Sequence, residues 1–196
     1  DILGGEEITN KCLDGALWYL KKGYSVIPLN GKIPLIEWQK YQTVRATEEE
    51  IKAWWVKFPE ANVGIVTGKL SNLTVIDIDD PEVLKTLTFP PTFTVTTGKG
   101  IHLYYQFVES RNTVKIAGLK IDLRSEGGQV CAPPSLHKDT GKFYTITKNL
   151  PTAPFPTEWL TKVETSKPAS QWKESIGQVT SEGSRNATFA SVIGGL

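Results

Sequence analysis

The sequence predicts an α+β protein in which helices flank a mixed β-sheet. Helical spacing of apolar residues is concentrated before about residue 60, whereas short β-branched runs dominate between about residues 60 and 146. In addition, no glycine-rich phosphate loop follows the first predicted strand, which argues against a doubly wound nucleotide-binding fold.

Two helices are predicted in the N-terminal part. The first covers residues 9–22, with Thr9 or Asn10 as its cap and Gly23 as its stop. A second predicted helix, residues 47–58, opens with the Thr-x-x-Glu spacing of a capping box and ends before a proline. The apolar spacing of both indicates amphipathic helices that cover a sheet.

The strands are predicted from apolar and β-branched runs. Residues 24–29 form the first, and residues 62–67 and 73–78 are separated by a five-residue loop that favours a hairpin. Further strands are expected at residues 92–97, 102–107, 119–123, 129–132 and 143–146. A short helix is expected around Trp159, after a proline-rich exit.

The C-terminal part changes in character. Residues 161–180 are polar and aperiodic and are predicted to be a linker, and residues 181–196 are predicted to begin a helical module. The chain has no methionine, even at position 1, and ends without a helix stop, so we expect it to be a piece of a longer protein.

Composition excludes few functions. The net charge of +1 argues neither for nor against nucleic acid, so such binding would depend on local basic clusters. Cys12 and Cys131 are too few for a disulfide framework or a structural zinc site and are predicted to be free thiols. No signal peptide or long apolar run is present, which predicts a cytoplasmic protein with no membrane partner.

The first candidate for chemistry is the Asp-x-Asp at the end of the strand at residues 73–78. The two-residue period places Asp77 and Asp79 on one face, where two carboxylates repel each other unless a cation lies between them. Mg²⁺ or Mn²⁺ suits such oxygen ligands. The alternative is that Asp79 and Asp80 only cap a turn before Pro81, and an isolated Asp-x-Asp favours that alternative.

The second candidate is a small glycine-rich loop before the strand that begins at His102. Backbone amides of Thr97, Gly98 and Lys99 could form an anion nest, to which Lys99 and His102 add positive charge for a polyphosphate. The alternative is a simple glycine turn, with His102 as a half-buried histidine whose hydrogen bonds are satisfied.

The third candidate is the pair Asp122 and Arg124, which share a strand face. A third carboxylate and a guanidinium could therefore meet the first pair across the sheet, where arginine suits bidentate contact with phosphate. The alternative is an ordinary ion pair on a solvated face.

These three elements, in this order, resemble the bifunctional DNA primase-polymerase domain of the archaeo-eukaryotic primase superfamily. The resemblance covers residues 13–160, and it implies a catalytic domain over residues 1–160 with a core related to the RNA-recognition-motif fold. The stretches that support it are residues 23–29 with Lys32 to Pro34 and Trp38, residues 62–68, and residues 130–137 with Gly141 and Tyr144.

The resemblance implies roles for individual residues. Asp77, Asp79 and Asp122 would hold two divalent metal ions, Mg²⁺ or Mn²⁺, and would be catalytic together with His102. Nucleotide contacts are implied for Thr97, Gly98, Lys99, His102, Arg124, Ser135 and His137. The implied partners are a DNA template and primer, ribo- or deoxynucleoside triphosphates, and a helicase domain in the full-length protein.

Two other functions fit parts of the sequence. A metal-dependent nucleotide-sugar transferase would use Asp77 and Asp79, but it leaves the His102 and Asp122 motifs without a role. A non-catalytic module would bind single-stranded nucleic acid through exposed tryptophans such as Trp54 and Trp55. Helical spacing favours a place for both tryptophans in the helix core.

Overall fold

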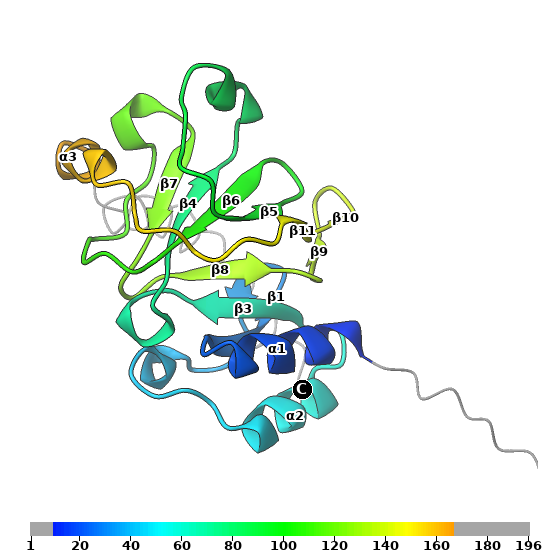
Figure 1. Cartoon of the computed structure of the whole chain (residues 1–196). Helices are drawn as coiled ribbons and strands as arrows, with labels where there is room; N and C mark the ends of the chain where they lie inside the picture. Colours follow the sequence, from blue (N-terminus) through cyan, green and yellow to red (C-terminus); the bar gives the residue numbers. More distant parts are fainter. Residues whose placement is uncertain (1–9, 167–196) are drawn as a thin grey trace, which may run out of the picture.

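The computed structural model describes residues 10–166 (Figure 1). In chain order, its elements are α1 (Lys11–Lys21), β1 (Ser25–Asn30), β2 (Ile33–Pro34), η1 (Gln39–Gln42), α2 (Glu48–Lys57), β3 (Asn62–Val66), η2 (Lys69–Ser71), β4 (Thr74–Ile78), η3 (Pro81–Lys85), β5 (Phe93–Thr96), β6 (Ile101–Tyr105), η4 (Ile116–Gly118), β7 (Ile121–Arg124), β8 (Gln129–Ala132), β9 (Leu136–His137), β10 (Lys142–Phe143), β11 (Thr145–Lys148) and α3 (Glu158–Glu164), where η denotes a 3₁₀ helix.

The first sheet has four strands in the order β2-β1-β3-β8, and every neighbouring pair is antiparallel. Helices α1 and α2 lie against this sheet (Figure 1). The predicted caps are present, because Asn10 accepts hydrogen bonds from two amides of α1, and Thr47 and Glu50 form the capping box of α2. Local sequence signals therefore define both helices.

The second sheet has five strands in the order β11-β5-β6-β4-β7, again antiparallel. Helix α3 packs on its outer face, where Trp159 and Val163 join the buried side chains of the strands. The opposite face turns toward the first sheet, and its buried residues Val75, Val95 and Tyr104 belong to the same core as α1 and α2. The second sheet thus lies between two hydrophobic cores.

The α+β class is confirmed, but the sheet is arranged differently from the prediction. The strands divide into two antiparallel sheets and a small hairpin of β9 and β10, and an isolated bridge between Tyr105 and Ala153 is parallel. The predicted hairpin between residues 62–67 and 73–78 is wrong. Strands β3 and β4 belong to different sheets, joined only by an isolated bridge between Gly68 and Leu73.

The remaining predictions concern the chain ends and the tryptophans. Helix α3 extends to Glu164, inside the region predicted as a linker, and residues 181–196 lie outside the described residues. Trp55 is 3% exposed and donates to the Ala61 carbonyl, and Trp54 packs against Tyr41 at the edge of the same core. Both belong to the helix core, as helical spacing indicates. Within residues 10–166, no helix is long and apolar enough to cross a membrane.

Candidate active site

Three predicted site residues form one row across the second sheet. Asp77 on β4 lies directly opposite His102 on β6 and directly opposite Asp122 on β7. Side chains that are direct partners in an antiparallel ladder project from the same face. The side chains of His102, Asp77 and Asp122 therefore lie in this order on the face that turns toward the first sheet.

Asp77 and His102 form a nearly buried pair at the centre of this row. The His102 Nε2 atom lies 3.4 Å from the Asp77 Oδ1 atom, and the side chains are 5% and 15% exposed. Burial acts to raise the pKa of Asp77, but the adjacent His102, followed by Lys32 and Arg124, holds the pKa of this carboxyl below its ordinary value. Asp77 is therefore kept as a carboxylate in spite of its burial.

The second nitrogen of His102 has no partner among the described residues. Its Nδ1 atom is buried and makes no hydrogen bond. A buried polar atom without a partner is costly in free energy and is uncommon in folded proteins. This atom is thus a candidate for contact with a ligand.

Asp122 and Arg124 form an ion pair along β7. The Arg124 Nη2 atom donates to Asp122 Oδ2 at 2.8 Å, and the Lys115 amide donates to Asp122 Oδ1 at 3.0 Å. Burial raises the pKa of the Asp122 carboxyl above its ordinary value. The Lys115 amide and Arg124 oppose this rise, whereas Asp77 and Asp79 add to it. Three carboxylates therefore interact electrostatically at this end of the sheet.

Asp79 lies just beyond the end of β4. Its side chain is exposed, and its backbone amide donates to the Lys120 carbonyl. The predicted turn cap is also observed at Asp80, whose side chain accepts a hydrogen bond from the Glu82 amide at the start of η3. Asp80 therefore caps the turn, while Asp77 belongs to the charged row.

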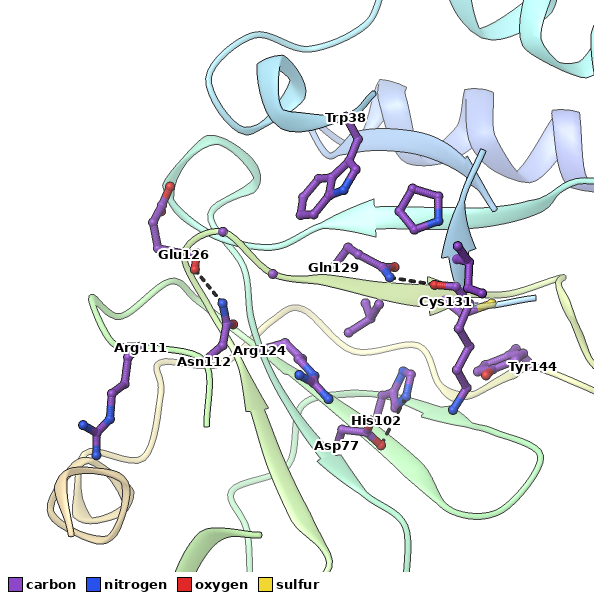
Figure 2. Close-up of a pocket in the computed structure, with 16 residues that line it drawn as sticks. Trp38, Asp77, His102, Arg111, Asn112, Arg124, Glu126, Gln129, Cys131 and Tyr144 are labelled. Atoms are coloured by element: carbon purple, nitrogen blue, oxygen red, sulfur yellow. Dashed lines mark hydrogen bonds and ion pairs between the residues drawn. The ribbon is translucent and has the colours of Figure 1, made fainter. Parts of the chain in front are cut away.

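A cavity of about 750 Å³ opens above the charged row, between the two sheets (Figure 2). Asp77, His102 and Arg124 line it from the second sheet. Gln129 and Trp38 face them from the side of the first sheet (Figure 2). The volume lies in the range of small-molecule sites, and the lining combines charged groups with an aromatic ring.

Residues 16–159 match the family described as bifunctional DNA primase/polymerase, N-terminal, or Prim-Pol. The chain belongs to this family. No curated protein matches the chain. The Prim-Pol family comprises nucleotidyltransferases of the primase and polymerase type, which generally use divalent metals and act on nucleotides and nucleic acid.

The donor chemistry of this Prim-Pol domain fits a hard divalent cation. Asp77 and Asp122 are neighbouring carboxylates on one face, and Asp79 follows at the strand end. Such oxygen ligands suit Mg²⁺ and Mn²⁺. Within residues 10–166, however, no three acidic, histidine or cysteine side chains are gathered closely enough to form a metal site by themselves. Instead, His102 lies beside Asp77, and Arg124 forms an ion pair with Asp122.

The glycine loop of the Prim-Pol domain has a steric explanation. A Cβ atom at Gly98 would lie 2.3 Å from His137 Cγ, and one at Gly100 would lie 1.8 Å from the Ile78 carbonyl oxygen. Both positions therefore need glycine because the loop packs tightly against its neighbours. The predicted anion nest is only partly compatible with this geometry, since the amides of Lys99 and Gly100 donate to the Thr97 hydroxyl.

Other predicted nucleotide contacts lie away from the main cavity. Ser135 is fully buried, and its hydroxyl accepts from the Val63 amide at 2.8 Å, so it holds the loop after β8 against β3. Ser135 is thus closed off from both cavities, and its role here is structural. His137 is also buried but lines a second cavity. Lys99 lies beside Asp139, 3.7 Å away.

Several residues that line the main cavity were not identified as site residues by sequence reasoning. Trp38, Lys32 and Tyr144 lie in stretches that support the family resemblance, which was the only signal available for them. Gln129 carried no signal at all. Its amide donates to the Lys32 carbonyl, and its buried Oε1 has no hydrogen-bond partner among the described residues.

Proposed function

We propose that this Prim-Pol domain is a template-dependent nucleotidyltransferase with DNA primase and DNA polymerase activity. It adds ribo- or deoxynucleoside triphosphates to a growing strand on a DNA template. The observation that carries the proposal is the row of His102, Asp77 and Asp122, whose first two members line the 750 Å³ cavity, in a chain of this family. A helicase domain elsewhere in a longer protein remains a prediction.

The acidic residues would hold the metal ions of this reaction. Asp77 and Asp122, with Asp79 at the strand end, supply oxygen ligands on one face. Mg²⁺ or Mn²⁺ bound there would activate the primer 3′ hydroxyl and neutralise charge on the pyrophosphate leaving group. The low pKa of Asp77 keeps this ligand ionised.

The other charged residues would position the nucleotide. His102 is held by Asp77 through Nε2, which leaves Nδ1 for a hydrogen bond to the substrate. Arg124 is oriented by Asp122 and lines the cavity, where its guanidinium would contact a phosphate. Phosphoryl transfer depends mainly on such positioning and charge neutralisation.

Primer extension with labelled nucleotides and Mg²⁺ or Mn²⁺ tests the proposal. Asp77→Ala and Asp79→Ala are each expected to lower template-dependent incorporation by at least about a hundredfold, because charge stabilisation in the transition state is lost. Circular dichroism should show that both variants stay folded. Asp14→Ala on α1, an exposed aspartate far from the row, is the control. Full activity in either site variant would refute the metal assignment.

His102 provides a more specific test of nucleotide positioning. His102→Ala is expected to raise the apparent KM for nucleotide by about 10- to 100-fold, as expected for a lost hydrogen bond to a charged group. The effect on kcat should be smaller. Steady-state kinetics with a primed template measure both constants. An unchanged KM would remove His102 from the nucleotide site.

A further inference from the structure

A second cavity, of about 330 Å³, adjoins the first. Lys32, Ile33 and Tyr144 line both cavities. The Tyr144 ring lies between His102 of the first cavity and His137 of the second, with 5.9 Å between ring centroids on each side. The two cavities are therefore neighbouring compartments with Tyr144 as their common wall.

The second cavity has a basic lining. Lys32 and Lys138 belong to it, and Lys142 lies directly opposite His137 in the β9–β10 ladder and so shares its face. Lys99 is close by, beside Asp139. This region therefore carries several lysines and one carboxylate, whereas the protein as a whole is nearly neutral. The local positive charge favours binding of a polyanion.

The same region also exposes apolar side chains. Ile33 is 71% exposed, Phe143 is 63% exposed and Leu136 is 39% exposed. Phe143 and Leu136 are direct partners in the β9–β10 ladder, so they form an apolar pair on one face of the hairpin. Lys142 and Phe143 are consecutive in β10 and therefore lie on opposite faces of the hairpin. An exposed aromatic ring and lysines on one hairpin suit a single strand that passes along its edge, because bases stack on the ring while lysines contact phosphates.

The hairpin is held firmly enough to act as a binding surface. The Asn62 amide nitrogen donates to the carbonyls of Gly31 and Leu136, and its oxygen accepts from the Leu136 amide. Lys138 also bonds to Asn30. The hairpin is thus tied to the β1–β2 turn and stands at the end of β8 in Figure 1. A pre-positioned surface loses little conformational entropy on binding.

We propose that the second cavity and the β9–β10 hairpin hold the single-stranded part of the template beside the nucleotide site. Phe143 stacks on a base, and Lys142 contacts the phosphate backbone. This inference rests on the proposed function, because it takes the first cavity as the nucleotide site. The proposal places the template strand at the side of the first cavity that Lys32 and Tyr144 line.

The test measures strand binding and nucleotide binding separately. The strand probe is a fluorescein-labelled single-stranded oligodeoxythymidylate of about 12 nucleotides, within the usual site size of single-strand binding folds. The nucleotide probe is a non-hydrolysable deoxynucleoside triphosphate with Mg²⁺. Phe143→Ala is expected to weaken binding of the oligonucleotide by roughly tenfold or more. The affinity for the nucleotide should stay unchanged.

Lys142→Ala gives a second, independent readout. The slope of log K against log salt concentration should become shallower by about 0.7, the value for one lost phosphate contact on a single strand. Val56→Ala and Lys85→Ala remove an exposed apolar side chain and an exposed lysine elsewhere and serve as matched controls. Neither should change the affinity or the salt slope. All four changes lie at exposed positions, so the fold should persist.

Two outcomes would overturn the proposal. One is strand binding by both hairpin variants that equals that of the wild type. The other is a parallel loss of nucleotide affinity, which would assign the second cavity to the nucleotide's own phosphates. A wild-type protein that binds the strand through Phe143 but extends no primer would instead refute the proposed function and leave this contact in place.

Discussion

The two faces of strands β4, β6 and β7 differ in their chemical character. Toward α3, the strands present Ile76, Leu103 and Leu123, which lie in a closed apolar core. Toward the first sheet, the adjacent positions Asp77 and Asp122 carry charge, and Asp77 lines a cavity. A single step along the chain separates a core residue from a candidate catalytic residue.

This contrast shows how the fold supports the site. Because strand side chains alternate, a shift of one residue in the register of β4 would exchange the two faces completely. The apolar side chains that face α3 help to set the register, since they gain free energy when they are buried there. The core under α3 therefore positions the carboxylates, although it never contacts a ligand in the cavity.

The largest expected effect comes from the charged face. Asp122→Asn keeps an acceptor for the Lys115 amide but removes the negative charge, so we expect primer extension to fall by at least about a hundredfold. The midpoint of urea unfolding should change little. Asp14→Asn, on α1, controls for the loss of one carboxylate. Wild-type extension by Asp122→Asn would show that the row does not act as a unit.

The adjacent residue should behave in the opposite way. Leu123 is fully buried, so Leu123→Ala is expected to lower the free energy of unfolding by about 2 to 5 kcal/mol, from lost burial and the resulting cavity. Well below its unfolding temperature, the variant should extend primers nearly as well as the wild type. Urea titration and extension assays measure the two effects. Leu84→Ala, at a 38% exposed position, is the control.

A severe loss of activity in folded Leu123→Ala would contradict the separation of the two faces. It would mean that the position of Asp122 depends on the packing of its immediate neighbour beyond the register that the sheet provides. The comparison between Asp122→Asn and Leu123→Ala therefore shows whether the two faces of the sheet act independently or are coupled.

Much of the charged row could be predicted from sequence because it depends on local patterns. Alternation places Asp122 and Arg124 on one strand face, and in the structure Asp122 lies directly opposite Asp77, whereas Arg124 lies opposite Val75 and pairs with Asp122. The helix caps were equally predictable, since a capping box involves residues only three positions apart. Local periodicity was sufficient in these cases.

Long-range arrangement could not be predicted in the same way. The spacing of β3 and β4 suits a hairpin, yet each strand finds its partners elsewhere in the chain. Strand β3 pairs with β1 and β8, and strand β4 pairs with β6 and β7. Nor does any local signal show that Gln129 and Trp38 would face Asp77 across a cavity. Such contacts depend on how two sheets pack, which no short window of sequence contains.

The smallest predicted effect concerns Ser135. It tests whether this residue has a structural role or a role in nucleotide binding. Its hydroxyl accepts from the Val63 amide at a fully buried position, so Ser135→Ala leaves that amide without a partner and should cost about 1 to 3 kcal/mol of stability. The KM for nucleotide should stay unchanged. The control Thr86→Ala removes an exposed hydroxyl and should change stability by no more than about 0.5 kcal/mol. A raised KM in a fully stable Ser135→Ala protein would return this residue to the nucleotide site, since a buried structural hydroxyl affects stability before it affects substrate binding.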